Sequence, residues 1–149
     1  IPLKAYIDFS AFKLFIVDVG LLSAMGNIEL KTLLEGNNIF MEFKGAITEQ
    51  FVLQQLTCNN SFDIYYWSAE RSAAEIDFVV QFKNTVVPIE VKAEENLQAK
   101  SLKVFYQKYN DTVPVRTSMS DYRKESWLTN IPLYLINYLH KEIDNFTQS

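Results

Sequence analysis

Two short segments of the sequence combine charged side chains with apolar neighbours in a way that could support chemistry. Asp77 lies within residues 75–80, where the side chains around it are Ile, Phe and Val. Glu90 and Lys92 lie at the end of a second segment, residues 86–92. If both segments are strands, side chains alternate between two faces, so Glu90 and Lys92 share one face. Pairing of the two strands would place Asp77 beside Glu90.

This combination of residue types predicts metal-dependent hydrolysis of a phosphodiester. Two adjacent carboxylates repel each other unless a cation lies between them, and a desolvated aspartate needs a partner or a metal. Oxygen ligands of this kind suit Mg²⁺ or Mn²⁺. Lys92 could orient an attacking water or stabilise charge on the transition state. A simple salt-bridged cluster of little energetic weight explains Asp77, Glu90 and Lys92 equally well.

Glu49 is a fourth candidate, on a helix predicted over residues 39–56. Its neighbours one turn away include Ala46, Val52 and Leu53, so it borders the packed face of that helix. We expect Glu49 to complete the metal site directly or through water, and a solvated helix carboxylate is the equal alternative.

A later predicted helix carries Lys100 and Lys103, three residues apart. These two side chains could meet a phosphate backbone. A charged helix face is more often simply solvated, and we favour that interpretation here.

The elements that must position these residues follow from periodicity and turn signals. Apolar residues recur at spacings of three to five over residues 39–56, which indicates an amphipathic helix. Asp18 is expected to cap a short helix that Gly26 ends. The remaining predicted elements are a helix over 29–34, strands over 63–67, 75–82 and 86–92, a helix over 97–109, a strand over 113–117 and a helix over 133–143. The order predicts an α/β fold with a mixed β-sheet flanked by helices, in which the last strand lies parallel to an earlier one.

Composition restricts the class of protein. A chain of 149 residues with 48% hydrophobic side chains fits one domain with a sizeable core. Its net charge of −4 gives no general attraction to nucleic acid. Cys58 and His140 are alone of their types, which excludes a Cys-based zinc site and argues against a His-dependent nucleophile. No apolar run approaches the ~18 to 20 residues of a membrane span, so we expect a cytoplasmic protein without a membrane partner.

Several stretches of the sequence together resemble a known prokaryotic family. They are residues 1–6, 12–22, 44–46 with Glu49, 75–80, 88–92 and 101–103, and more loosely 131–134. In this order and spacing they resemble a domain of unknown function that is found C-terminal to AAA-type ATPases. That family is placed with the PD-(D/E)XK nuclease-like superfamily.

The resemblance implies a restriction-endonuclease-like fold. It implies that Asp77, Glu90 and Lys92 are catalytic and that Asp77 and Glu90 bind Mg²⁺ or Mn²⁺. Glu49 would correspond to the acidic residue that the superfamily carries on a helix of its active site. It also implies a AAA-type ATPase domain N-terminal to these residues in the same chain, in agreement with the absence of an initiator Met and a signal peptide. Residues 1–36 would join the ATPase to a nuclease-like domain formed by residues 37–149. Because the sequence has no Gly-x-x-x-x-Gly-Lys-Ser/Thr motif, nucleotide hydrolysis would belong to the other domain.

The sequence therefore supports two alternative functions. The first is divalent-metal-dependent hydrolysis of DNA or RNA, coupled to the ATPase. The second is a catalytically silent protein-interaction or regulatory module of that ATPase, which the acidic net charge favours.

Overall fold

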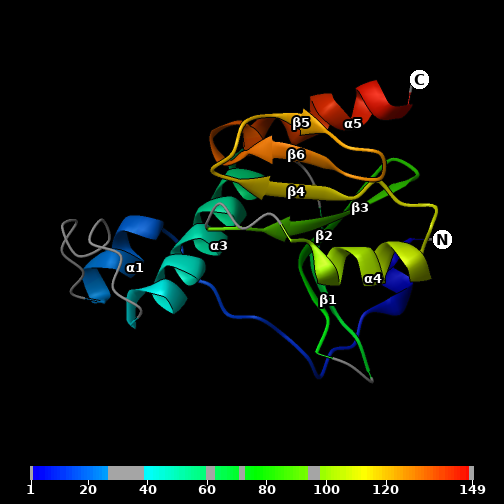
Figure 1. Cartoon of the computed structure of the whole chain (residues 1–149). Helices are drawn as coiled ribbons and strands as arrows, with labels where there is room; N and C mark the ends of the chain where they lie inside the picture. Colours follow the sequence, from blue (N-terminus) through cyan, green and yellow to red (C-terminus); the bar gives the residue numbers. More distant parts are fainter. Residues whose placement is uncertain (1, 27–38, 60–62, 71–72, 94–97, 148–149) are drawn as a thin grey trace.

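The computed structural model describes residues 2–26, 39–59, 63–70, 73–93 and 98–147 (Figure 1). The helix predicted over residues 29–34 lies outside these ranges. In chain order the described elements are the 3-10 helix η1 (Leu3–Tyr6), helices α1 (Val19–Met25) and α3 (Ile39–Asn59), strands β1 (Ile64–Ser68), β2 (Glu75–Phe82) and β3 (Thr85–Val91), helix α4 (Lys100–Lys108), strands β4 (Val115–Ser118), β5 (Arg123–Lys124) and β6 (Thr129–Pro132), the 3-10 helix η2 (Leu133–Tyr138) and helix α5 (Leu139–Thr147).

The six strands in these parts of the chain form one mixed sheet in the order β1-β2-β3-β4-β6-β5. β1, β2 and β3 are antiparallel neighbours, and α4 carries the chain over to β4, which is parallel to β3. β6 lies parallel to β4, and β5 is antiparallel to β6 at the edge. The predicted α/β class, the hairpin of β2 and β3 and the parallel return across a helix are therefore confirmed.

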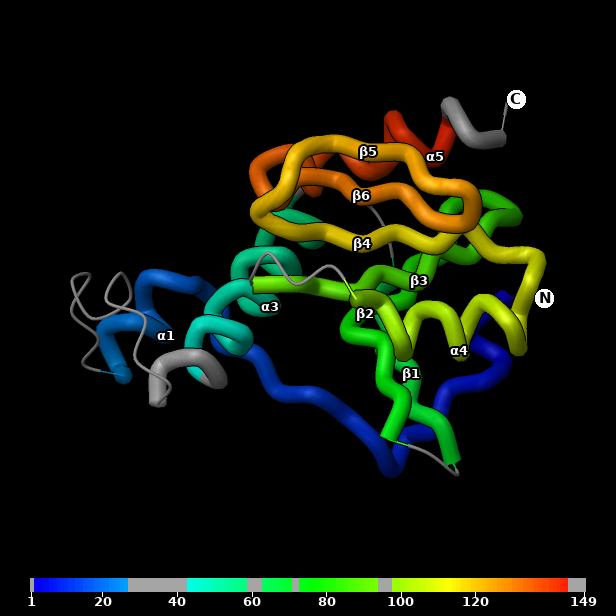
Figure 2. The backbone as a smooth tube through the Cα atoms, in the orientation of Figure 1, coloured from blue at the N-terminus to red at the C-terminus, as the bar shows by residue number. Residues whose placement is uncertain are grey.

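Helices cover both faces of the sheet (Figure 2). Phe78 and Ile89 belong to a core cluster that includes residues of α3, η2 and α5, whereas Val79 belongs to a second cluster with Leu102 and Phe105 of α4. Adjacent residues of β2 thus point to opposite helical layers, as the alternation of a strand requires. No helix in the described ranges is both long and apolar enough to cross a membrane.

Most predicted boundaries match the structure within a few residues. Asp18 caps α1 by accepting the backbone N–H of Leu21 at 2.9 Å, and Gly26 follows the helix as expected. The long helix α3 continues three residues beyond the predicted end. The predicted closing helix is divided into the 3-10 helix η2 and the α-helix α5.

Residues 3–18, called the N-terminal strap below, lie against the sheet and α3. The backbone N–H of Leu3 donates to the Gln81 side chain on β2 at 2.9 Å, and Lys4 pairs with Asp63 at 3.0 Å. Figure 2 shows the strap running from the β1 side of the molecule to α1, which contacts α3. The strap therefore packs against the elements that carry the predicted site residues.

Candidate functional site

Glu90 and Lys92 share one face of the end of β3, as predicted. The Lys92 ammonium lies 2.7 Å from Oε1 of Glu90, and the intervening Val91 packs against the core on the other face. Glu90 is only 5% exposed, and its second oxygen, Oε2, is buried without a hydrogen-bond partner. A buried carboxylate oxygen without a donor is costly, and a bound cation is one way to satisfy it.

Asp77 lies at a β-bulge in β2. The register between β1 and β2 shifts there, so that Asp77 and Phe78 together lie opposite Tyr66 alone. Bulges change the direction of side chains and are frequent next to active sites. Phe78 packs into the core, while Oδ2 of Asp77 accepts a hydrogen bond from the backbone N–H of Val91 on β3 at 2.7 Å. The bulge thus directs the Asp77 carboxyl toward the end of β3 that carries Glu90.

The environment of Asp77 favours its protonated form. Burial raises the pKa of Asp77 from 3.8 to about 7, and the negative charges of Glu49 and Glu90 add to this rise. The hydrogen bond from Val91 and the charge of Lys13 oppose it. Glu49 and Glu90 therefore each lie close enough to Asp77 to influence its carboxyl electrostatically.

Glu49 is half-buried on α3. Burial raises the pKa of Glu49, Lys13 lowers it, and Glu75 raises it again. Within the described ranges, no three His, Cys, Asp or Glu side chains form a ready-made metal cage. Mg²⁺ keeps several waters and needs only one or two carboxylates, so the pair Asp77 and Glu90 has the ligand chemistry for this ion without such a cage. Glu49 is near enough to contribute electrostatically to such a site.

Lys13 is a member of this charged group that the sequence did not indicate. It comes from the N-terminal strap. Its Nζ lies 2.5 Å from Oε1 of Glu75 and 5.3 Å from the centre of the Tyr66 ring. A cavity of about 290 Å³ beside it is lined by residues of the strap, α3, β1 and β2, and Lys13 and Asp77 are the two charged residues in that lining. Only the unusual position of a lysine between Phe12 and Leu14 could have pointed to it.

Lys100 and Lys103 are exposed on α4, in agreement with the interpretation as a solvated face. A third lysine of this helix, Lys108, lies over the ring of Trp67, with Nζ 5.8 Å from the ring centre. This contact is an intramolecular cation–π interaction of ordinary kind.

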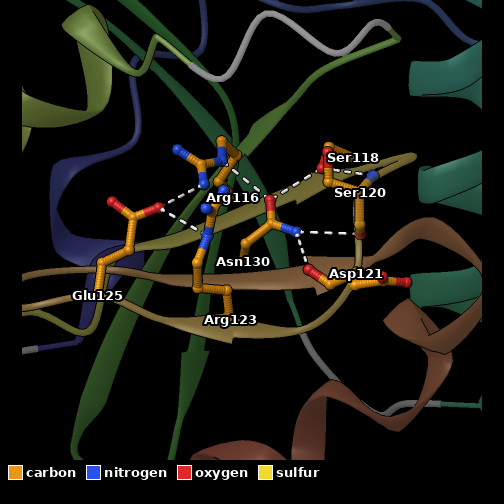
Figure 3. A network of polar contacts seen from close by, with 7 residues as sticks. All are labelled: Arg116, Ser118, Ser120, Asp121, Arg123, Glu125 and Asn130. Atoms are coloured by element: carbon orange, nitrogen blue, oxygen red, sulfur yellow. Dashed lines mark hydrogen bonds and ion pairs between the residues drawn. The ribbon is translucent and has the colours of Figure 1, made fainter.

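A second polar group occupies the other half of the sheet (Figure 3). Arg116 on β4 is 2% exposed and is the register partner of Glu90, so the two residues share one face of the sheet. Its guanidinium donates to Asn130 at 2.9 Å and pairs with Glu125 at 2.7 Å. Asn130 in turn accepts from Ser118 Oγ at 2.9 Å. These contacts connect β4 to β6 and to the segment around β5.

Replacing Arg116 with Met should therefore destabilise the fold. Removing one member of a buried charged network leaves its partners uncompensated, and we expect a loss of about 3–5 kcal/mol in the free energy of unfolding. Arg123 also pairs with Glu125, at 3.6 Å, but its side chain is exposed. Arg123→Met is the matched control and should cost less than about 1 kcal/mol. Urea denaturation of the three proteins makes the comparison, and equal losses in both variants would contradict the interpretation.

Comparison with known proteins adds one match. A search of curated proteins finds none that matches this chain. The sequence profile of the family described as "Domain of unknown function (DUF4143)" matches residues 44–136. The matched range contains Glu49, Asp77, Glu90 and Lys92, whereas Lys13 and the rest of the strap precede it. Because the match covers more than half of the chain, this chain belongs to the DUF4143 family.

Proposed function

We propose that this chain is a nuclease-like domain that hydrolyses phosphodiester bonds in DNA or RNA with Mg²⁺ or Mn²⁺. The observation that carries the proposal is the buried Glu90 oxygen without a partner, next to Lys92 and in the electrostatic range of Asp77. The order α3-β1-β2-β3-α4-β4, with β4 parallel to β3, supports a restriction-endonuclease-like arrangement. We further propose that the domain works with a AAA-type ATPase domain in the same chain.

Each residue of the proposed site has a separate task. Asp77 and Glu90 would hold the divalent ion, and Val91 fixes the Asp77 carboxyl through its backbone N–H. Such an ion supplies Lewis acidity and a bound water of lowered pKa. Lys92, held by Glu90 at 2.7 Å, places a positive charge where it can orient water and stabilise negative charge on phosphoryl oxygens. Glu49 adds negative charge that favours a cation in this region.

Cleavage of labelled single- and double-stranded DNA and RNA in the presence of Mn²⁺ tests the proposal. We expect cleavage that stops when EDTA removes the ion, and none by a Lys92→Met protein purified in parallel. Mn²⁺ should also raise the melting temperature by several degrees, because it binds only the folded chain. Absence of both cleavage and metal-dependent stabilisation would contradict the proposal.

A second candidate function is a catalytically silent interaction module of the ATPase. It is favoured by large apolar side chains exposed along the strap, among them Phe9 at 90% and Leu14 at 86%. Large apolar side chains exposed close together are typical of surfaces that contact other proteins. In this alternative Mn²⁺ has no effect on the melting temperature, so the same measurement separates the two functions.

A further inference from the structure

Lys13 occupies a fixed position beside the proposed metal ligands. Its side chain is only 24% exposed and forms its ion pair with Glu75, two residues before Asp77 on the same strand. Burial opposes the charged form, but the hydrogen bond with Glu75 and the charges of Glu49, Glu75 and Asp77 raise the pKa of Lys13. The ammonium is therefore charged and held among the acidic side chains of the site.

The strap that carries Lys13 is anchored on α3 just beyond it. The Gln50 side chain accepts the backbone N–H of Ile16 at 2.9 Å and donates to the carbonyl of the same residue at 2.5 Å. Gln50 is buried, and the ring of Phe15 packs against that of Phe78 at 5.8 Å. These contacts keep Lys13 in place independently of its own ion pair.

The two lysines of the site have different partners. Lys92 lies against Glu90, and Lys13 lies against Glu75 on the neighbouring strand. Lys13 and Asp77 line the same cavity and their charges interact, so a divalent ion bound by Asp77 and Glu90 would be repelled by the Lys13 ammonium. The partial burial of Lys13 strengthens this repulsion, because buried charges are screened less by solvent.

We propose that Lys13 is the resident counter-ion of the metal site and lowers its affinity for divalent cations, so that the strap sets how readily the site binds metal. This inference rests on the proposed function, because it assumes that Asp77 and Glu90 bind a divalent ion. It adds a site residue from outside the part of the chain that the family profile matches.

Isothermal titration of the whole chain with Mn²⁺ at pH 8 and low ionic strength tests the inference. Lys13→Met keeps the apolar stem and removes the charge, and we expect its dissociation constant to fall at least about fivefold. Lys13→Arg keeps the charge and should stay within about twofold of the parent chain. Lys4→Met is the matched control: it removes the other ion pair of the strap, with Asp63, and should also leave the affinity unchanged.

Each outcome decides the inference. Unchanged or weaker Mn²⁺ binding by Lys13→Met overturns it, as does equal tightening in Lys4→Met, which would reflect a loosened strap rather than a lost charge. If neither the parent chain nor Lys13→Met binds Mn²⁺, the proposed function fails together with the inference. If only Lys13→Met binds, the inference is supported. Lys13→Gln replaces Lys13→Met if the latter does not fold.

Discussion

Glu90→Gln is expected to abolish binding of Mg²⁺ or Mn²⁺, whereas Lys92→Met should keep metal binding and lose cleavage. The Gln side chain has nearly the same shape as Glu, but it removes the negative charge at a position that is only 5% exposed. Loss of a residue that only supports a metal ligand weakens metal binding by about 10–100-fold. Loss of the charged ligand itself should therefore weaken it by more than about 100-fold. In the proposed function Lys92 contributes charge to the reaction rather than a metal ligand, so its loss should reduce turnover by about 10²–10³-fold.

Titration calorimetry with Mn²⁺ and cleavage assays on the same preparations distinguish the two roles. Glu70→Gln and Lys103→Met are the matched controls, because both side chains are exposed and lie outside the charged group. Both controls should behave as the parent chain. Equal loss of metal binding in Glu90→Gln and Lys92→Met would indicate that the two residues form a structural ion pair. Retained cleavage in both variants would remove them from any catalytic role.

Local rules were sufficient to predict the part of the site on β3. Glu90 and Lys92 are two residues apart in a strand, so their common face depends on alternation alone. The two-residue turn at Lys83 and Asn84 fixes the pairing of β2 with β3, and Lys83 has the positive φ of 54° that such a turn requires. Ile89 therefore packs into the core, as the pattern of the segment indicated.

The position of the Asp77 carboxyl could not be predicted from its own strand. It depends on the bulge opposite Tyr66, and a bulge is set by how β1 pairs with β2. The contribution of Lys13 is still less local, because the strap is held on α3 and pairs with β2 through residues far along the chain. Long-range contacts of this kind leave no periodic signal in the sequence.

The second half of the sheet was also difficult to predict, for a different reason. β5 contains two residues and β6 four, so neither is long enough to show strand alternation. Arg116 and Asn130 are polar, yet both are buried because they hydrogen-bond to each other. Polar side chains in short segments indicate loops unless the partner strand is known, which is why the sequence predicts no strand between residues 117 and 133.

Asp77→Asn is expected to stabilise the metal-free protein at alkaline pH while removing its ability to bind metal. The folded chain raises the pKa of Asp77 from 3.8 to about 7, so it holds this proton more tightly than the unfolded chain does. The stabilisation from proton binding is complete below pH 3.8 and is lost as the pH rises through about 7. The difference between the two pKa values corresponds to at most about 4 kcal/mol. Asn cannot ionise, and its side-chain oxygen can still accept the Val91 N–H.

The free energy of unfolding, measured in urea with EDTA between pH 4 and pH 9, tests this expectation. The two proteins should be similar in stability near pH 4, and Asp77→Asn should become the more stable one above pH 7, by up to about 4 kcal/mol. Asp63→Asn, at an exposed aspartate just before β1, is the control for the same substitution outside the charged group. A constant difference between Asp77→Asn and the parent chain across this range would contradict the expectation. It would show that Asp77 has the same pKa in the folded and unfolded states. If Mn²⁺ then stabilises the parent chain but not Asp77→Asn, one residue accounts both for the instability of the metal-free fold and for the binding of the ion that relieves it.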